Sequence, residues 1–114
     1  MKKIYWVSRH FPTKSQVEAL KQLFNDDIHL VIDPNPFSSA EAVVNRYKSS
    51  GCHDILVVAP LSVIQKMTEM GVFPLWSEMK QCTKEEAEVE VNGRFYKFVR
   101  FRRIKGVKIE FEDV

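Results

Sequence analysis

The sequence predicts an α/β fold: a parallel sheet of about four strands with three helices, followed by a C-terminal antiparallel β-meander. Three apolar, strand-like runs are each followed by a hydroxyl-bearing residue that can cap a helix. This repeated strand-to-helix unit is typical of parallel sheets with right-handed crossovers. After Met79 the pattern changes to the alternation of antiparallel strands. At 114 residues we expect one domain, with a parallel core over residues 1–79 and the meander over residues 86–112.

The first predicted unit is a strand over Lys3–Ser8 and a helix over about Thr13–Phe24. Thr13 and Gln16 have the spacing of a capping box, in which side chains and backbone N–H groups at a helix start bond each other. The first backbone N–H groups of this helix should therefore face the loop that contains Arg9 and His10. A helix N-terminus favours anions at such a position.

The second unit begins with an apolar strand over Ile28–Asp33, as expected for a strand covered on both faces. A loop with two prolines follows at residues 33–37, and neither a helix nor a central strand would tolerate it. We expect Ser38 to cap the second helix, with Glu41 in the capping-box position and Gly51 as its stop.

The third unit is a strand over Asp54–Ala59 and a helix over about Ser62–Met70, with Ser62 and Gln65 as a third capping-box pair. Gly71 ends this helix, and a fourth strand follows over Val72–Trp76. The carboxyl ends of all four strands should converge on one edge of the sheet.

The meander is predicted from two alternating runs, Glu86–Val91 and Arg94–Ile104, that flank Asn92-Gly93, a strong hairpin signal. The register that this turn predicts pairs Val91 with Arg94, Val89 with Tyr96 and Ala87 with Phe98, and it sets Glu88 opposite Lys97. A second turn at Lys105-Gly106 should lead to a last strand that carries Val107, Ile109 and Phe111.

Composition excludes several function classes. Neither G-x-G-x-x-G nor a P-loop pattern occurs among only four glycines, which excludes an ordinary dinucleotide enzyme or NTPase, and G-x-S-x-G is absent. Cys52 and Cys82 are isolated, and neither they nor the three histidines have ligand spacing, so we expect no metal and no cofactor. No apolar run reaches the roughly 20 residues of a membrane span. We expect a reduced, cytoplasmic protein without a membrane segment.

The loop after the first strand carries the residues best suited to chemistry. Arg9 can grip a phosphate, His10 can transfer protons near neutral pH, and Ser8 can bond a phosphate oxygen. The structural alternatives are that Arg9 pairs with Asp33 or Glu78 and that His10 is an ordinary loop residue. We take Ser8, Arg9 and His10 as candidate catalytic residues.

Candidate ligand-binding residues lie at the same predicted edge of the sheet. The three hydroxyl caps are more often structural than functional. The candidates are Thr13, Gln16, Pro36, Phe37, Ser38, Pro60, Leu61, Ser62 and Glu78.

A second candidate surface is Arg94–Arg103, where basic residues alternate with aromatic ones as on proteins that bind single-stranded nucleic acid. Alternation gives a simpler explanation, with aromatic side chains on the sheet and basic ones in solvent. One face of this segment also suits a dimer interface. Nucleic-acid binding there is the weaker prediction, since the net charge is only +2.

The opening strand with Ser8-Arg9-His10-Phe11-Pro12-Thr13 and Gln16 resembles the start of small CRISPR-associated, CARF-like ring nucleases. The stretch Val57–Ser62, continuing into a helix that ends at Gly71, looks like the third strand and loop of that family. The resemblance covers about half of the chain, and the segment from Glu86 onward has no counterpart in it. It implies a Rossmann-like fold, a homodimer, and binding and cleavage of cyclic oligoadenylate second messengers in antiviral defence.

What the resemblance implies for the site is a pocket lined by the residues from Ser8 to Gln16 with Pro60, Leu61 and Ser62. Cleavage would need no metal, because the RNA 2′-hydroxyl is an internal nucleophile that the protein need only align and assist. Three alternatives stay open: a non-catalytic nucleotide sensor, a nucleic-acid- or protein-binding module, and a purely structural subunit.

Overall fold

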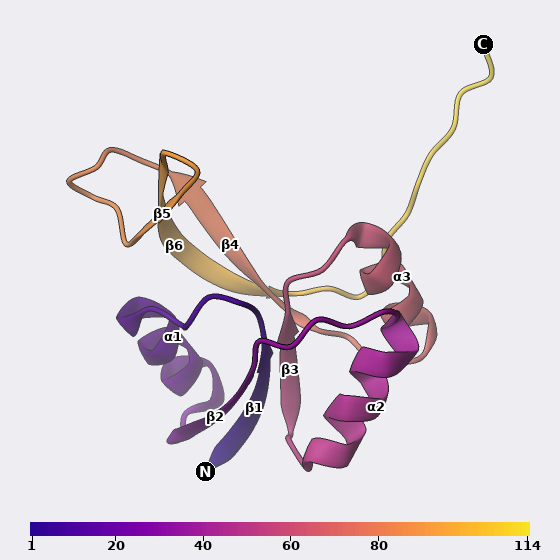
Figure 1. Ribbon diagram of the computed structural model, residues 1–114, viewed down its shortest axis with the longest axis horizontal. Helices are drawn as coiled ribbons and strands as arrows, with labels where there is room; N and C mark the ends of the chain where they lie inside the picture. The colour runs from indigo at the N-terminus through magenta and orange to yellow at the C-terminus, as the bar shows by residue number, and fades with distance from the viewer.

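The computed structural model describes residues 1–114, which form three helices and one six-stranded sheet that curls into a half-barrel (Figure 1). The order across the sheet is β2-β1-β3-β4-β6-β5. The strands are β1 (Lys2–Val7), β2 (Ile28–Asp33), β3 (Asp54–Val57), β4 (Leu75–Gln81), β5 (Val89–Val91) and β6 (Arg94–Arg103). The helices are α1 (Lys14–Phe24), α2 (Ala40–Ser50) and α3 (Leu61–Glu69).

The predicted fold class is wrong in its sheet. A Rossmann-like parallel sheet with an appended meander was expected, but the antiparallel strands belong to the same mixed sheet as the parallel ones. The error lies in the fourth strand: it does not end at Trp76 but runs over Leu75–Gln81 and pairs along its length with β6. Its parallel contact with β3 is the single pair Leu56↔Leu75. We call β4, β5 and β6 together the antiparallel arm.

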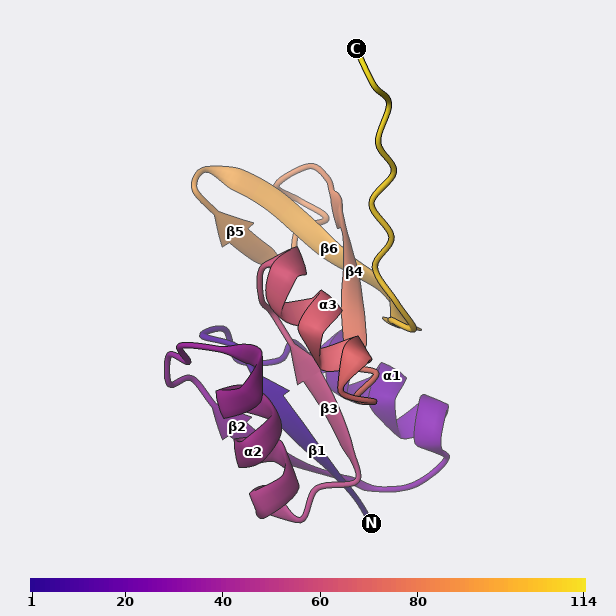
Figure 2. The same cartoon turned by 90° about the vertical axis from the view of Figure 1, so that its right-hand side faces the viewer.

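Two apolar clusters lie on opposite faces of the sheet. Alternation along β1 separates them, since Tyr5 and Val7 belong to one cluster and Trp6 to the other. The larger cluster packs α2 and α3 on the sheet, and the smaller one places Leu20 of α1 against Trp6, Leu56 and Leu75. Figure 2 shows α1 on the far side of the sheet from α2 and α3. The three layers hold the strand ends of β1 and β3 rigidly.

Local predictions at helix starts had mixed outcomes. The capping box of Thr13 and Gln16 is confirmed, and so is Gly51 as the left-handed stop of α2. The cap of α2 is Ser39 instead of Ser38, and its hydroxyl accepts from the N–H of Ala42. The cap of α3 is Pro60 with no side-chain bond, so the prediction for Ser62 is wrong: Pro60 fixes a backbone angle that starts the helix one residue earlier.

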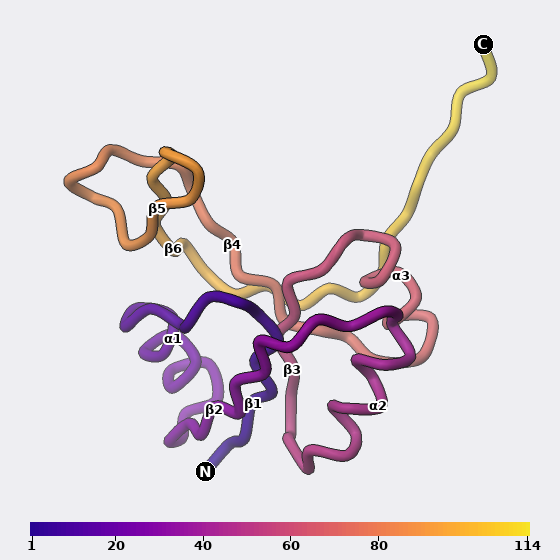
Figure 3. Tube along the Cα trace, in the orientation of Figure 1, coloured from indigo at the N-terminus to yellow at the C-terminus, as the bar shows by residue number.

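The hairpin register at Asn92-Gly93 is confirmed for the pairs Val91↔Arg94 and Val89↔Tyr96. Beyond these pairs the prediction is wrong, because β5 has only three residues and Lys97 bonds Glu86 instead of facing Glu88. The last predicted strand is also wrong. Residues 104–114 form no strand, and the chain after Val107 projects from the domain (Figure 3).

None of the three helices is both long enough and apolar enough to cross a bilayer.

Candidate functional site

A cleft of about 770 Å³ opens where β3 and β4 separate. Because β3 ends at Val57 while β4 continues to Gln81, the antiparallel arm rises beyond the carboxyl ends of the parallel strands (Figure 1). The cleft lies in that angle. It is lined by β1, the loop after it and the start of α1 on one side, by the end of β3 and the start of α3 on another, and by the arm and residues 104–107.

The loop after β1 is held by its own hydrogen bonds. The indole Nε1 of buried Trp6 donates to the carbonyl oxygen of His10 at 3.0 Å, and the backbone N–H of His10 donates to Oγ of Ser8 at 3.1 Å. These bonds fold the loop back over the end of the strand. Ser8, His10 and Phe11 line the cleft as a result.

The start of α1 forms the polar wall of the cleft. The backbone N–H of Thr13 donates to Oε1 of Gln16 at 2.8 Å, and the N–H of Gln16 donates to the Thr13 hydroxyl at 3.2 Å. The Nε2 of Gln16 donates to Oγ of Ser77 on β4 at 2.9 Å, which joins the helix to the arm. Ser15 also bonds the Glu88 carboxylate. Burial raises the pKa of Glu88, but the bonds from Ser15 and the N–H of Phe98 outweigh it, and the net shift is downward. The arm is therefore fixed to α1 by polar contacts.

The rest of the lining is apolar, since 15 of the 21 lining residues are hydrophobic. Much of this surface is open: Phe11 is 78% exposed, Leu61 71%, Val58 63% and Trp76 44%. Tyr96 from β6 completes the aromatic set. An apolar cleft with a few converging polar groups is the usual form of a small-molecule site.

The candidate catalytic residues occupy different places. Ser8 and His10 line the cleft, whereas Arg9 is exposed beside it and is not among the lining residues. Arg9 makes no hydrogen bond or ion pair, so the pairing with Asp33 or Glu78 does not occur. Its guanidinium is therefore exposed and has no acidic partner.

The candidate ligand-binding residues are only partly brought together. Thr13, Gln16 and Leu61 line the cleft, but Pro36, Phe37, Ser38, Pro60, Ser62 and Glu78 do not. Phe37 packs instead against the larger apolar cluster. Glu78 accepts from Arg100 at 2.7 Å and from Arg102 at 3.3 Å, and the bond from Arg100 is the main cause of its lowered pKa.

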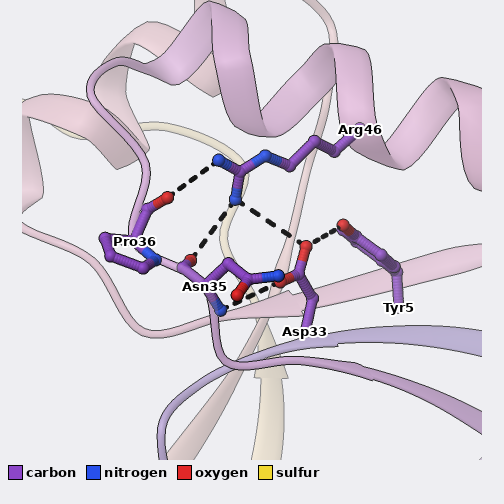
Figure 4. Close-up of polar contacts among 5 residues, drawn as sticks. All are labelled: Tyr5, Asp33, Asn35, Pro36 and Arg46. Atoms are coloured by element: carbon purple, nitrogen blue, oxygen red, sulfur yellow. Dashed lines mark hydrogen bonds and ion pairs between the residues drawn. The ribbon is translucent and has the colours of Figure 1, made fainter.

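The loop after β2 is anchored by a polar cluster of its own (Figure 4). The Tyr5 hydroxyl donates to the buried Asp33 carboxylate, and Arg46 of α2 lies 3.7 Å from it. Arg46 also donates to the carbonyl oxygens of Asn35 at 3.3 Å and Pro36 at 2.8 Å. Burial raises the pKa of Asp33, but the bonds from Tyr5 and the Asn35 N–H and the charge of Arg46 outweigh it and lower the pKa. This cluster holds the proline loop outside the cleft.

Sequence reasoning missed the wall that the arm supplies. Trp76, Ser77 and Met79 of β4 line the cleft beside Val89, Val91 and Tyr96 of the hairpin. The signal was present in the alternation of Val89, Val91 and Tyr96, which places them on one face of the predicted hairpin. In a meander appended to a parallel sheet this face has no neighbour, whereas in the mixed sheet it faces the cleft.

The basic residues of β6 are largely occupied by acidic partners. Lys97 bonds Glu86 at 2.7 Å, and Arg100 and Arg102 share Glu78. Both nitrogens at the tip of Arg103 donate to Asp54 at 2.7 Å, and the guanidinium also bonds the Phe73 carbonyl oxygen at 2.9 Å. This bonding favours the structural interpretation of the segment over a nucleic-acid surface.

No group of three or more histidine, cysteine, aspartate or glutamate side chains lies close enough together to hold a metal ion. A shallower concavity of about 490 Å³ lies away from the cleft, beside His53 and the Asp54–Arg103 pair. Comparison of the chain with protein-family models, with curated proteins and with solved structures gave no match. The cleft geometry is therefore the basis for the function proposed below.

Proposed function

We propose that the cleft between β3 and β4 binds a nucleotide ligand. The observation that carries this proposal is the lining: most of it is aromatic and aliphatic, and its few polar groups come from the loop after β1, the start of α1, β4 and Tyr96 of β6. A nucleobase has two apolar faces that stack on aromatic rings and a polar edge that needs a few donors and acceptors. Phe11, Trp76 and Tyr96 suit the faces, and the hydroxyl groups of Ser8 and Thr13, which also line the cleft, suit the edge.

The ligand that the resemblance of the Ser8–Thr13 loop implies is cyclic oligoadenylate. A cleft of about 770 Å³ is in the range that takes one drug-sized ligand, so a ring of several nucleotides extends past it. Its phosphates then lie outside the cleft, and the exposed Arg9, which stands between the lining residues Ser8 and His10 in the chain, is the candidate cation for them. We therefore propose a homodimer in which two clefts bind one ring of matching two-fold symmetry.

Cleavage, if the bound ring reaches the loop, follows from RNA chemistry. The 2′-oxygen attacks the adjacent phosphorus and gives its proton to a base, the 5′-oxygen leaves and is protonated, and the product ends in a 2′,3′-cyclic phosphate. His10 is the candidate base, and Arg9 is the candidate group for the added negative charge. Ser8 accepts from the His10 N–H and so holds that residue in place.

A non-catalytic sensor is the second candidate, and the apolar character of the cleft favours it. His10 is the only histidine among its lining residues, and no aspartate, glutamate, cysteine, lysine or arginine lines it. Such a lining suits retention of a ligand more than acid–base work at its phosphates.

Binding should be measured with cyclic tetra-adenylate and cyclic hexa-adenylate in EDTA, by calorimetry and by chromatography of products. We expect Trp76→Ala to weaken binding about tenfold, because stacking is worth roughly 1–3 kcal/mol per base. Phe73→Ala is the matched control, since Phe73 is also 44% exposed but lies outside the cleft. It should bind as the wild type does.

Two further variants separate the two candidates. Arg9→Ala should weaken binding, and His10→Ala should keep binding and abolish cleavage if the protein is an enzyme. Binding without any product supports the sensor. If neither ring binds at micromolar concentration, the nucleotide proposal is wrong.

A further inference from the structure

The segment Lys108–Asp113 has the pattern of a strand but no partner. Ile109 and Phe111 alternate with Lys108, Glu110 and Glu112, as in a strand with one apolar face. Ile109 is 62% exposed and Phe111 91%. No backbone group from Lys105 onward takes part in a hydrogen bond, and Figures 1 and 2 show the segment leading away from the domain. Its apolar side chains have nothing in their own chain to pack against.

The cleft is bordered by a strand edge that lacks a pairing partner. One edge of β4 pairs with β6, but the other edge pairs with β3 at Leu75 alone, so the stretch Trp76–Gln81 has no strand beside it. This edge borders the cleft, whose walls expose Phe11, Val58 and Leu61. An open strand edge next to apolar pockets is what binding by strand addition requires, because the backbone gives affinity and the pockets take alternate side chains.

The free edge of β4 and the segment Lys108–Asp113 match in length and in charge. The free edge has six residues and the segment Lys108–Asp113 has six, close to the usual length of a strand. The segment carries three acidic residues and one basic residue. On β6, across β4 from the free edge, Arg100 and Arg102 share the single carboxylate of Glu78, which leaves one positive charge unmatched, and Arg9 in the loop after β1 has no partner. An acidic strand is favoured there over a neutral or basic one.

We propose that the segment Lys108–Asp113 of a second copy of this chain adds to the free edge of β4, and that the exchange is reciprocal. Val107 packs against the larger apolar cluster and so fixes where the segment leaves its own domain. Because each copy offers one segment and one edge, a two-fold axis satisfies both at once and closes the assembly as a dimer. The added strand occupies the same cleft as the nucleotide proposed above, so the two exclude each other, and this proposal does not rest on that ligand.

The first test is the mass of the full chain, without ligand, by sedimentation equilibrium. The wild type should form a dimer, and Phe111→Asp should weaken its association at least about tenfold, as expected when a central anchor is lost. Phe111 is almost fully exposed within the single chain, so this variant should fold, and an unchanged circular-dichroism melt of the monomer verifies it. Phe73→Asp, outside the segment and the cleft, should leave the dimer intact.

The second test distinguishes exchange between copies from closure of the segment over its own cleft. Phe111→Asp damages the segment alone, and Leu61→Asp damages the cleft alone. When the two variants are mixed, exchange predicts a heterodimer with one intact interface, seen as partial recovery of association. Closure within one chain predicts no recovery, and a wild type that stays monomeric at 100 μM would also overturn the proposal.

Discussion

Asp33 shows how one residue sets the position of a loop. Its carboxylate is buried at the end of β2, where it accepts from Tyr5 of β1 and from the Asn35 N–H and lies near Arg46 of α2. Burial and the bond to Asp33 raise the pKa of the Tyr5 hydroxyl, so Tyr5 remains a donor throughout the neutral range. A buried carboxylate without these partners would be costly. The cluster therefore stabilises the fold only while Asp33 is ionised.

The sign of the pH dependence follows from the lowered pKa of Asp33. The unfolded chain binds a proton at Asp33 near pH 3.9, while the folded chain does so only at lower pH. The stabilisation is therefore complete above the unfolded value and is lost as the pH falls through the folded one. Asp33→Asn should cost about 1–2 kcal/mol of unfolding free energy at pH 7, and it should flatten the loss of stability as the pH falls below the unfolded pKa of about 3.9.

Urea titrations at successive pH values measure this profile. Asp27→Asn, at an exposed site, should keep the slope of the wild type. An identical slope for Asp33→Asn and the wild type would contradict the role given to Asp33.

At the scale of elements, the hairpin turn between β5 and β6 has a conformation that its own two residues specify. Asn92 and Gly93 both have positive φ, at 52° and 76°, which is the conformation of a tight hairpin whose twist matches its strands. Asparagine tolerates this region, and glycine adopts it without cost. The turn therefore fixes the register that brings Val89, Val91 and Tyr96 to the cleft.

Gly93→Ala should destabilise the protein by about 1–2 kcal/mol through its backbone angle alone. A Cβ at this position would meet no atom within 4 Å, so steric clash contributes nothing. Gly106→Ala is the matched control, because that position is equally open and has no positive φ. Thermal melts of both variants measure the difference. Equal melting temperatures would show that the positive φ of Gly93 does not require glycine.

At the scale of the whole molecule, a single ion pair ties the arm to the parallel strands at its base. Arg103 at the end of β6 bonds both oxygens of Asp54 at the start of β3, across a sheet that β3 and β4 join by one residue pair. The bond to Asp54 raises the pKa of Arg103, which stays charged at any ordinary pH. Asp54 is 9% exposed, so removing Arg103 would leave a buried carboxylate without its ion-pair partner.

Arg103→Met should lower the free energy of unfolding by about 1–2 kcal/mol, less than for a fully buried pair because the guanidinium is partly exposed. Arg100→Met removes an equally short ion pair of a more exposed arginine and should stay close to the wild type. Chemical denaturation of the two variants provides the comparison. An equal loss of unfolding free energy in both variants would show that the Arg103–Asp54 pair stabilises the fold no more than the exposed Arg100–Glu78 pair does.

What the sequence predicted correctly is local. The capping box of Thr13 and Gln16 and the turn at Asn92-Gly93 depend on neighbours within a few residues, and both formed as expected. The cleft positions of Ser8 and His10 follow from the rule that parallel strands end at one edge.

What the sequence did not predict is decided by distant contacts. How far Leu75–Gln81 pairs on each edge depends on distant strands: β3 ends at Val57 and pairs with Leu75 alone, whereas β6 pairs with the strand along its whole length. For the same reason Pro36, Phe37 and Ser38 lie outside the cleft, since Arg46, thirteen residues after Asp33, holds their loop toward α2. A side chain that acts across the fold leaves no periodic signal in the sequence.

The single pair between β3 and β4 also has a mechanical consequence. Leu56 and Leu75 are the only pair through which the antiparallel arm joins the parallel strands in the sheet, and both lie in the smaller apolar cluster, so the arm can tilt about this pair. The width of the cleft opening is held by two polar contacts of α1: the bond from Gln16 to Ser77 and the bond between Ser15 and Glu88. Exchange of those few polar bonds for contacts with an incoming molecule would widen or narrow the mouth while both cores stay folded.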